Sequence, residues 1–115
     1  MTQNLSAPLK DLTILADDTA SRWCTTEEYG DADVIMLYGP AALDAIAFTI
    51  EVASTIVSQV AKTLQAGDTP ADVAPPGAGK AQAYFDLPTA GSFRIKAASA
   101  VAADRTWQAT KQFKG

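Results

Sequence analysis

The stretch Lys80–Phe113, KAQAYFDLPTAGSFRIKAASAVAADRTWQATKQF, carries the clearest structural pattern in this 115-residue chain. In Ser92–Ala97, apolar residues alternate with Ser, Arg and Lys, and this period of two places the apolar side chains on one face of a strand. Thr106–Thr110 repeats the pattern with Trp107 and Ala109 directed inward. Both segments therefore predict strands with one buried face and one face in water.

The segment Leu87–Gly91, which contains Pro and Gly, indicates a turn between Ala81–Phe85 and Ser92–Ala97. We expect the two flanking segments to form a hairpin, which the Trp107 strand extends to three neighbouring antiparallel strands. In this arrangement the indole of Trp107 packs on Phe93 and is buried between two sheets.

The first part of the chain predicts two more strands. Leu9–Leu15 has Leu12 and Ile14 on one side and polar residues on the other. Ser21–Thr26 is expected to be a second strand that buries Trp23.

Asp17-Asp18 predicts a turn, and Glu27–Asp31 predicts a polar connection. Ala32–Tyr38 is a continuous apolar run that ends at Gly39-Pro40. Such a run is typical of a strand buried on both faces, in the middle of a sheet or against a partner subunit.

Ala41–Gln65 fits two interpretations. Apolar residues spaced four apart, between Pro40 and Gly67, allow an amphipathic helix. The many Val, Ile and Thr residues favour strands, because β-branched side chains lose freedom in a helix. We therefore expect strands at Ile46–Ala53 and Gln59–Leu64 with a turn near Ser54–Ser58.

Ala66–Gly79 is rich in Pro and Gly and predicts a surface loop. Seven or eight short strands with frequent turns predict an all-β fold, an antiparallel β-sandwich or jelly roll. Met1–Pro8 is polar and is expected to be a flexible N-terminal arm, and residues 9–115 are expected to form a single β-sandwich domain.

Charge and hydropathy argue against several classes of protein. The net charge is −4, and an acidic domain is poorly suited to a phosphate backbone, so we expect no nucleic-acid partner. The apolar runs are too short to span a bilayer, so we expect no membrane association. The start MTQNLSAPLKD lacks a basic segment followed by an apolar run, so we expect no signal peptide and synthesis in the cytoplasm.

The sequence offers little catalytic chemistry. Gly77-Ala78-Gly79-Lys80 resembles the end of a phosphate-binding loop, but Ala74 and Ala81 stand where that motif needs Gly and Ser or Thr. The chain contains no His, the commonest general base and metal ligand. Its one cysteine, Cys24, is expected to be a small buried hydrophobe. We therefore predict no enzymatic activity, no catalytic residues and no cofactor.

Two weaker interpretations concern binding. The pairs Asp17-Asp18 and Asp31/Asp33 could hold a hard cation, but short acidic pairs beside turns are usually only solvated, so we predict no metal site. The larger aromatic residues could form a sugar-binding platform, although such residues more often supply core volume. They are Trp23, Tyr29, Tyr38, Tyr84 and Trp107.

The order of several segments resembles small β-sandwich structural proteins of tailed bacteriophages. The resemblance covers about Leu9–Phe113. The chain departs from it at Ser54–Ser58, where such proteins carry a Gly- or Asp-rich turn. The segments that carry it are Tyr38-Gly39-Pro40, Phe48–Val52, Thr63–Asp68, the loop ending Gly79-Lys80, Gly91–Ile95 and Ala102–Trp107.

This resemblance implies a virion structural protein without enzymatic activity, specifically a decoration or cement subunit on the exterior of the phage head. Its implied partners are the major capsid protein or other virion proteins, and further copies of itself, in a trimer before a dimer. Exposed edges of Leu9–Leu15 and Ala32–Tyr38 are expected to favour such self-association. The alternatives are a neck or tail component, or a carbohydrate-binding module for host recognition.

Overall fold

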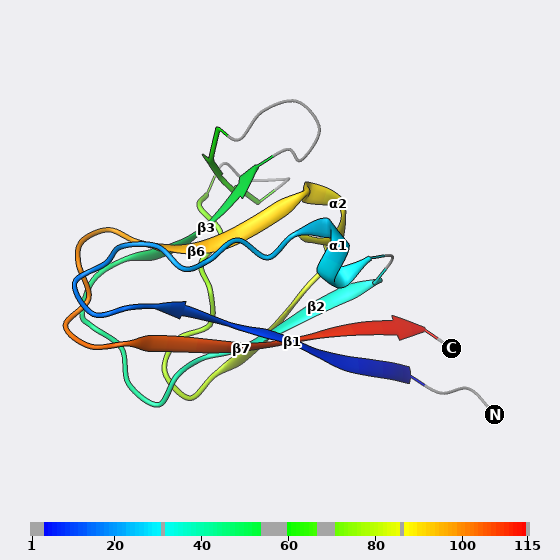
Figure 1. Ribbon diagram of the computed structural model, residues 1–115, viewed down its shortest axis with the longest axis horizontal. Coiled ribbons are helices and arrows are strands. Elements are labelled where there is room, and N and C mark those ends of the chain that lie inside the picture. The colour runs from blue at the N-terminus through cyan, green and yellow to red at the C-terminus, as the bar shows by residue number, and fades with distance from the viewer. Residues whose placement is uncertain (1–3, 31, 54–59, 67–70, 86, 115) are drawn as a thin grey trace.

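Two antiparallel β-sheets pack face to face in the computed structural model, which describes residues 4–30, 32–53, 60–66, 71–85 and 87–114 (Figure 1). This arrangement confirms the expected all-β sandwich, with seven strands and two single-turn helices in the described residues. The elements are β1 (Asn4–Ile14), α1 (Thr26–Tyr29), β2 (Val34–Tyr38), β3 (Phe48–Ala53), β4 (Lys62–Thr63), β5 (Ala81–Tyr84), α2 (Leu87–Ala90), β6 (Ser92–Ala97) and β7 (Arg105–Lys114).

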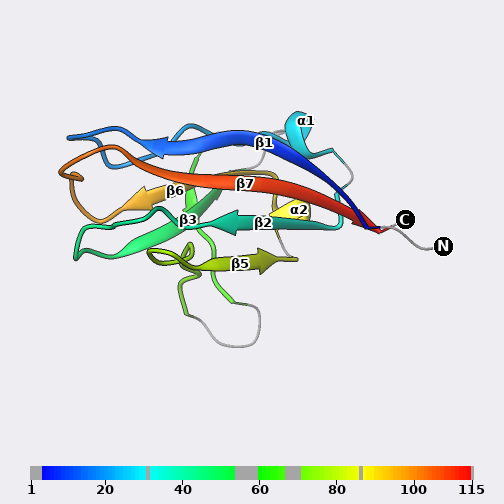
Figure 2. The same cartoon turned by 90° about the horizontal axis from the view of Figure 1, so that it is seen from below.

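The larger sheet has four strands in the order β1-β7-β2-β5, and the smaller sheet has the order β4-β3-β6. The view in Figure 2 looks onto the larger sheet. β2 pairs with β5 on one side and β7 on the other, which confirms the central strand expected at Ala32–Tyr38. The expectation that this segment leaves an open edge is therefore wrong.

β1 is longer than expected. Residues 4–8, assigned to a flexible arm, pair with β7 from Asn4↔Lys114 to Pro8↔Thr110, so the expected arm is wrong over this part. Met1–Gln3 lie outside the described residues. The register shifts between Leu9 and Leu12, which indicates a bulge at positions 10 and 11.

Arg22 holds this bulge in place. Its Nε donates to the carbonyl of Asp11 at 3.0 Å, and its Nη2 donates to the carbonyl of Lys10 at 2.7 Å. The same guanidinium contacts the Glu28 carboxylate of α1 at 2.8 Å. One side chain therefore links the bulge of β1 to the first helix.

The segment before α1 covers the free edge of β6 without forming the strand expected at Ser21–Thr26. Isolated bridges join Ala20 to Lys96 and Cys24 to Phe93. Residues opposite each other in an antiparallel bridge share a face, so Cys24 lies beside the inward Phe93 and is fully buried. Trp23 consequently faces outward and is only half-buried, so the prediction that it is the buried residue was wrong.

The hairpin expected from Ala81–Phe85 and Ser92–Ala97 does not form. β5 lies in the larger sheet and β6 in the smaller one, and α2 carries the chain between them. Alternation predicts which face of a strand is buried but not its partner, because Tyr84 and Phe93 can both point into one core from opposite sheets.

The described part of Ala41–Gln65 contains two strands and no helix, although β3 begins two residues later than expected, at Phe48, and β4 contains only Lys62 and Thr63. β3 and β4 pair at Glu51↔Thr63 and Val52↔Lys62, which confirms the strand interpretation over the helical one. The turn expected at Ser54–Ser58 lies outside the described residues. The polar connection expected at Glu27–Asp31 instead contains α1, whose Tyr29 is fully buried.

The core lies between the sheets, with Trp107 as its largest fully buried side chain. Its indole Nε1 donates to the buried Pro76 carbonyl at 3.0 Å, and its ring packs against Phe48 at a centroid distance of 5.4 Å. Phe93 and Ile95 are also fully buried, as the alternating pattern predicted. Among the described residues, no helix is long and apolar enough to cross a membrane.

Candidate functional site

The outer face of the four-stranded sheet is the most distinctive surface of the molecule. Trp107 and Ala109 of β7 point into the core, so the residues between them point away from it. The strand registers then assign the outward positions of β1, β2 and β5. The described side chains at these positions, which we call the uncharged face, are Ser6, Pro8, Thr13, Val34, Met36, Tyr38, Ala81, Ala83, Thr106, Gln108, Thr110 and Gln112.

None of these side chains carries a charge, although charged residues make up 19% of the chain. Short hydroxyl and amide side chains occupy β7, and larger apolar or aromatic side chains occupy β2. Tyr38 is 36% exposed, and Gln108 beside it in the register is also exposed. The centre of the sheet therefore presents a surface of mixed, neutral character.

Charged residues lie at the two edges of this face. The bulge of β1 exposes Lys10 and Asp11 at one edge. Lys80 is exposed at the other edge, directly before β5. A neutral centre with charges at the rim is the composition typical of protein–protein contact surfaces.

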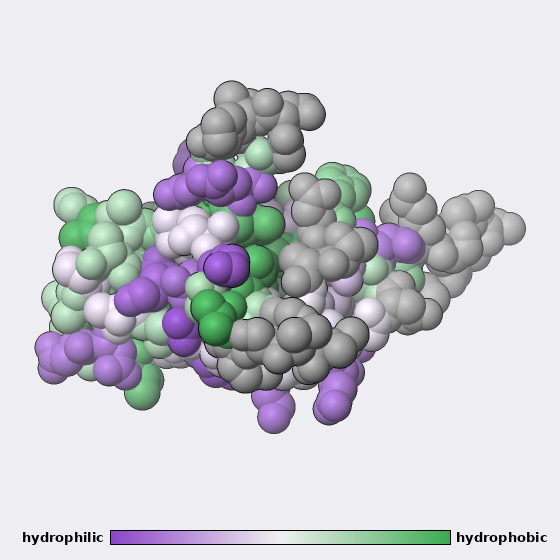
Figure 3. Space-filling model, turned by 90° about the horizontal axis from the view of Figure 1, so that it is seen from above, coloured by the Kyte–Doolittle hydropathy of each residue, from purple (hydrophilic) through white to green (hydrophobic). Residues whose placement is uncertain are grey.

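The outer face of the three-stranded sheet is charged. Glu51 and Arg94 are register partners, and their side chains form an ion pair at 2.8 Å. The Arg94 guanidinium lies 4.4 Å from the ring centroid of Trp23, and Lys96 donates to the Thr19 hydroxyl. Figure 3 looks onto this side of the molecule, where hydrophilic residues gather across the middle. The two outer faces of the sandwich therefore differ in charge.

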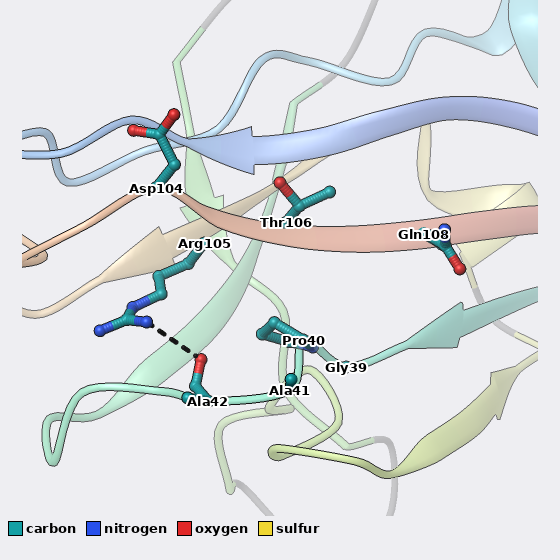
Figure 4. Close-up of a pocket in the computed structure, with 8 residues that line it drawn as sticks. All are labelled: Gly39, Pro40, Ala41, Ala42, Asp104, Arg105, Thr106 and Gln108. Atoms are coloured by element: carbon teal, nitrogen blue, oxygen red, sulfur yellow. Dashed lines mark hydrogen bonds between the residues drawn. The ribbon is translucent and has the colours of Figure 1, made fainter.

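Two hollows open on the uncharged face on either side of Gln108. The first has a volume of about 490 Å³ and lies between the start of β7 and the segment that follows β2 (Figure 4). The second has a volume of about 360 Å³ and includes Asp11 of the bulge and Tyr38. Both are open hollows that a side chain of a neighbouring molecule could enter.

The arginine that lines the first hollow already pairs with an acidic side chain of the same chain. Arg105 Nε donates to Asp44 Oδ1 at 2.7 Å, and Arg105 Nη1 donates to the Ala42 carbonyl at 3.4 Å. A hydrogen bond from the Ala102 amide, together with Arg105, holds the pKa of Asp44 below its usual value. Because Arg105 has this partner, it positions the loop after β2 and is poorly placed to bind an external anion.

The titratable groups with the largest pKa changes lie in the core. Burial raises the pKa of the Cys24 thiol to about 12, with the Glu28 carboxylate as a smaller cause. Burial also raises the pKa of Tyr29 to about 12 and raises that of Tyr84. The Tyr29 hydroxyl donates to the Gly91 carbonyl, and that of Tyr84 donates to Ala74 at 2.6 Å. These groups are therefore protonated at neutral pH, and they contribute to core packing and hold loops to the sandwich.

The candidate ligands named from the sequence are not assembled into one site. In the turn that the sequence predicted, the Asp18 amide donates to the Leu15 carbonyl and the Asp17 amide donates to the Val101 carbonyl. Asp31 lies outside the described residues. In the part of the chain that the structure describes, no group of three or more acidic or cysteine side chains could hold a metal ion. The Gly77–Lys80 segment forms a turn beside Gly39 and Pro40.

The five aromatic residues do not form a common platform. Tyr29, Tyr84 and Trp107 are buried, Trp23 lies under Arg94 on the smaller sheet, and Tyr38 lies on the larger one. They supply core volume and separate surface contacts instead.

The sequence pattern predicted which positions of β7 point outward, but it predicted only an ordinary solvent-exposed face there. The available signal was their composition, because Thr106, Gln108, Thr110 and Gln112 alternate with inward residues and none is charged. The lack of charge on β7 indicates a contact surface only in combination with Val34, Met36 and Tyr38. The register of β2 with β7 places these three residues next to the outward residues of β7.

Comparison with protein-family models, curated proteins and solved structures finds no match to this chain.

Proposed function

We propose that this protein is a non-enzymatic structural subunit of a tailed-bacteriophage virion, a decoration or cement protein on the exterior of the head. The observation that carries the proposal is the uncharged face of the four-stranded sheet. A surface of this composition is suited to being covered by a neighbouring protein.

The physical reason lies in the cost of desolvation. A charge buried at an interface without a partner is expensive, so contact surfaces have few charges at their centre. The molecule has a net charge of −4, yet the centre of this face is neutral. The opposite face, with the Glu51–Arg94 ion pair, is suited to solvent. A subunit with one covered and one solvated face fits the surface of a large particle.

The state of the titratable groups supports a structural role over a catalytic one. Cys24 and Tyr29 are held protonated by burial, and Arg105 is engaged with Asp44. Each of these groups therefore has a place in packing or in loop attachment.

The placement on the head rests on the resemblance to phage β-sandwich proteins, and its partner there is the major capsid protein. A neck or tail component with the same fold is the competing placement. Copy number separates the two, because a head lattice offers many equivalent sites and a neck or tail tip offers few.

The test is reconstitution of the particle. Heads purified without this protein are mixed with the purified chain, and bound copies are counted by quantitative mass spectrometry. The proposal predicts saturable binding of many copies per head. Absence of binding would contradict a virion role, and a few copies confined to the tail end would support the competing placement.

Two matched variants test the role of the face. Gln108→Glu places a carboxylate at its centre with little change in shape, and Thr49→Glu places one on the opposite sheet. We expect Gln108→Glu to reduce occupancy and Thr49→Glu to preserve it. Equal occupancy for both variants would show that the uncharged face is not covered in the particle.

A further inference from the structure

We propose that a notch in the four-stranded sheet binds an extended, uncharged peptide segment of a neighbouring protein, which adds to β7 as an extra strand. The notch is the hollow of about 490 Å³ between Gly39–Ala42 and Asp104–Thr106. This inference deepens the proposed function, and it rests on that function only for the source of the segment, which is the neighbour that covers the uncharged face. The binding site itself can be tested on the purified chain.

The notch exists because β2 leaves the sheet before it reaches the start of β7. The described pairing of these two strands ends at Tyr38↔Gln108, whereas the pairing of β7 with β1 continues to Ile14↔Arg105. In Figure 4 the two chains diverge from this point, and Gly39–Ala42 turns away from β7. The start of β7 therefore has a paired strand on one side and an open hollow on the other.

The hydrogen-bond pattern directs the backbone of Thr106 into this notch. The Gly39 amide donates to the carbonyl of the residue before Ala81, and Ala81 is the register partner of Tyr38. Tyr38 and Ala81 are therefore a non-hydrogen-bonded pair, so Tyr38 turns its own N–H and C=O toward Gln108 of β7. Because backbone direction alternates along a strand, the N–H and C=O of Thr106 point to the same side as those of Gln108.

Two observations on β1 agree with this assignment. Thr13 and Thr106 are register partners whose hydroxyl oxygens lie 2.9 Å apart, as expected for the closer, non-hydrogen-bonded kind of pair. Pro8 is the partner of Thr110, and by the same alternation its nitrogen faces the free edge of β1, where a proline is tolerated. The backbone groups of Thr106 therefore face away from β1.

Within the described residues, the segment after β2 supplies no partner for these groups. Continuation of the register would place Pro40 opposite Thr106, and a proline has no N–H to donate. The Pro40 carbonyl already accepts the Gly79 amide at 2.9 Å. An open N–H and C=O on one extended residue are the groups that an added strand binds, so the matching ligand is a peptide backbone.

The lining of the notch favours an uncharged segment with small side chains. Gly39–Ala42 forms one wall and carries no charged side chain. Arg105 is already paired with Asp44, and the Asp104 side chain points away from Ala42, toward a backbone amide that follows β1 (Figure 4). Gln108 adds an exposed, neutral amide beside the notch. A charged side chain of the segment would therefore lose water with little compensation.

The test is an NMR titration of the isotope-labelled full chain with the capped peptide acetyl-Thr-Ala-Thr-Ala-Thr-amide. We expect saturable binding with a dissociation constant on the order of 1 mM, because few groups take part in the contact. The amide signal of Thr106 should shift most. The same peptide with every backbone nitrogen methylated cannot donate to β7 and should bind at least about 10-fold more weakly. Equal binding of the two peptides would overturn the inference.

Amide hydrogen exchange provides an independent measurement. The Gln108 amide is bonded to β2 and the Thr106 amide is open, so Thr106 should exchange at least about 10-fold faster after correction for intrinsic rates. The peptide should slow this exchange. Equal protection of both amides in the free chain would overturn the inference. A Thr106 signal that shifts with chain concentration, without peptide, would also overturn it, because the notch would then bind a second copy.

Two variants assign the binding to the notch. Thr106→Pro removes the N–H that faces the notch and no bond to β1 or β2, so it should fold, as checked by circular dichroism, and bind the peptide at least about 5-fold more weakly. Thr13→Val loses the same hydroxyl contact but leaves the notch unchanged, and it should bind like the wild type. Equal affinities of the two variants would overturn the inference. If Thr106→Pro does not fold, the exchange measurement decides.

Binding to heads is measured separately from binding of the peptide. A Thr106→Pro variant that binds no peptide but decorates heads like the wild type would reject the neighbour as the source of the segment and leave the virion role intact. A wild type that binds the peptide but no heads would reject the proposed function and leave the strand-binding site intact.

Discussion

Replacement of Trp107 by Ala tests the sandwich architecture most sharply. The indole is fully buried, packs on Phe48 at 5.4 Å and donates to the Pro76 carbonyl at 3.0 Å. Removing a buried Trp side chain costs ~3–5 kcal/mol in transfer and cavity terms. The Pro76 carbonyl also loses its donor, and an unpaired buried acceptor costs a further ~1–3 kcal/mol.

This loss is large for a domain of this size. At ~0.05–0.15 kcal/mol per residue, the chain is expected to have a free energy of unfolding of roughly 6–17 kcal/mol. Trp107→Ala should therefore remove about half of the stability or abolish folding. Trp107→Phe keeps most of the apolar volume but loses the N–H donor, and it should cost ~1–3 kcal/mol.

The assay is urea unfolding followed by far-UV circular dichroism, at a concentration low enough for the chain to be monomeric. Gln82→Ala, which shortens an exposed side chain on the edge strand β5, serves as the control and should change stability by no more than about 0.5 kcal/mol. A free energy of unfolding for Trp107→Ala within about 1 kcal/mol of the wild type would refute the reasoning, because surface changes have effects of that size.

Three other changes test separate parts of the structure. A Cβ on Gly39 would lie 2.0 Å from the Gly77 carbonyl oxygen, so Gly39→Ala should cost at least ~1–3 kcal/mol in thermal or urea unfolding. Gly77→Ala, whose Cβ meets nothing within 4 Å, is the matched control, and equal losses would contradict this close approach. Burial raises the pKa of Cys24 from 9.0 to about 12, so the stability it contributes is complete below pH 9 and is lost as the pH rises toward 12. At pH 8 the thiol should react with a disulfide reagent only as fast as the chain opens, and rapid reaction of folded protein would refute its burial. Arg94→Ala breaks the partly buried ion pair with Glu51 and should lower the free energy of unfolding by ~1–2 kcal/mol. This is more than expected for a residue on the solvent-exposed face of a strand without such a partner. A double-mutant cycle with Glu51→Ala should show coupling between the two, and a coupling energy of zero would mean that the pair contributes nothing.

Much of the fold follows from alternation along single strands. The patterns at Ser92–Ala97 and around Trp107 predicted the buried faces of β6 and β7, and both are confirmed. The apolar run that became β2 predicted a strand in the middle of a sheet, and β2 indeed pairs with a strand on each side. Burial on both faces, which such a run also predicts, is not found at Tyr38, whose side chain is 36% exposed.

The pairing of strands was less predictable. β5 and β6 read as a hairpin because a Pro- and Gly-containing segment separates them, yet α2 carries the chain from one sheet to the other. A short connection allows either outcome, and the choice depends on partners far away in the sequence. The same limit explains Trp23, which was expected to be buried, because the bridge of Cys24 to Phe93 turns Cys24 inward and its neighbour Trp23 outward.

The candidate surface could be predicted only in part. The absence of charge at the outward positions of β7 from Thr106 to Gln112 is visible in the sequence, but the face exists only because the register places Met36 and Tyr38 beside that strand. The bulge that brings Asp11 to its edge depends on Arg22, which binds backbone carbonyls that no sequence pattern identifies.

The most direct test of the proposed role is a cryo-electron-microscopy reconstruction of the virion at a resolution that separates strands. The account predicts repeated density for the sandwich over the head exterior, with the uncharged face around Gln108 covered by a neighbour and the Glu51–Arg94 face toward solvent. Density confined to the neck or tail, or repeated head density in which the Gln108 face is open to solvent, would contradict it.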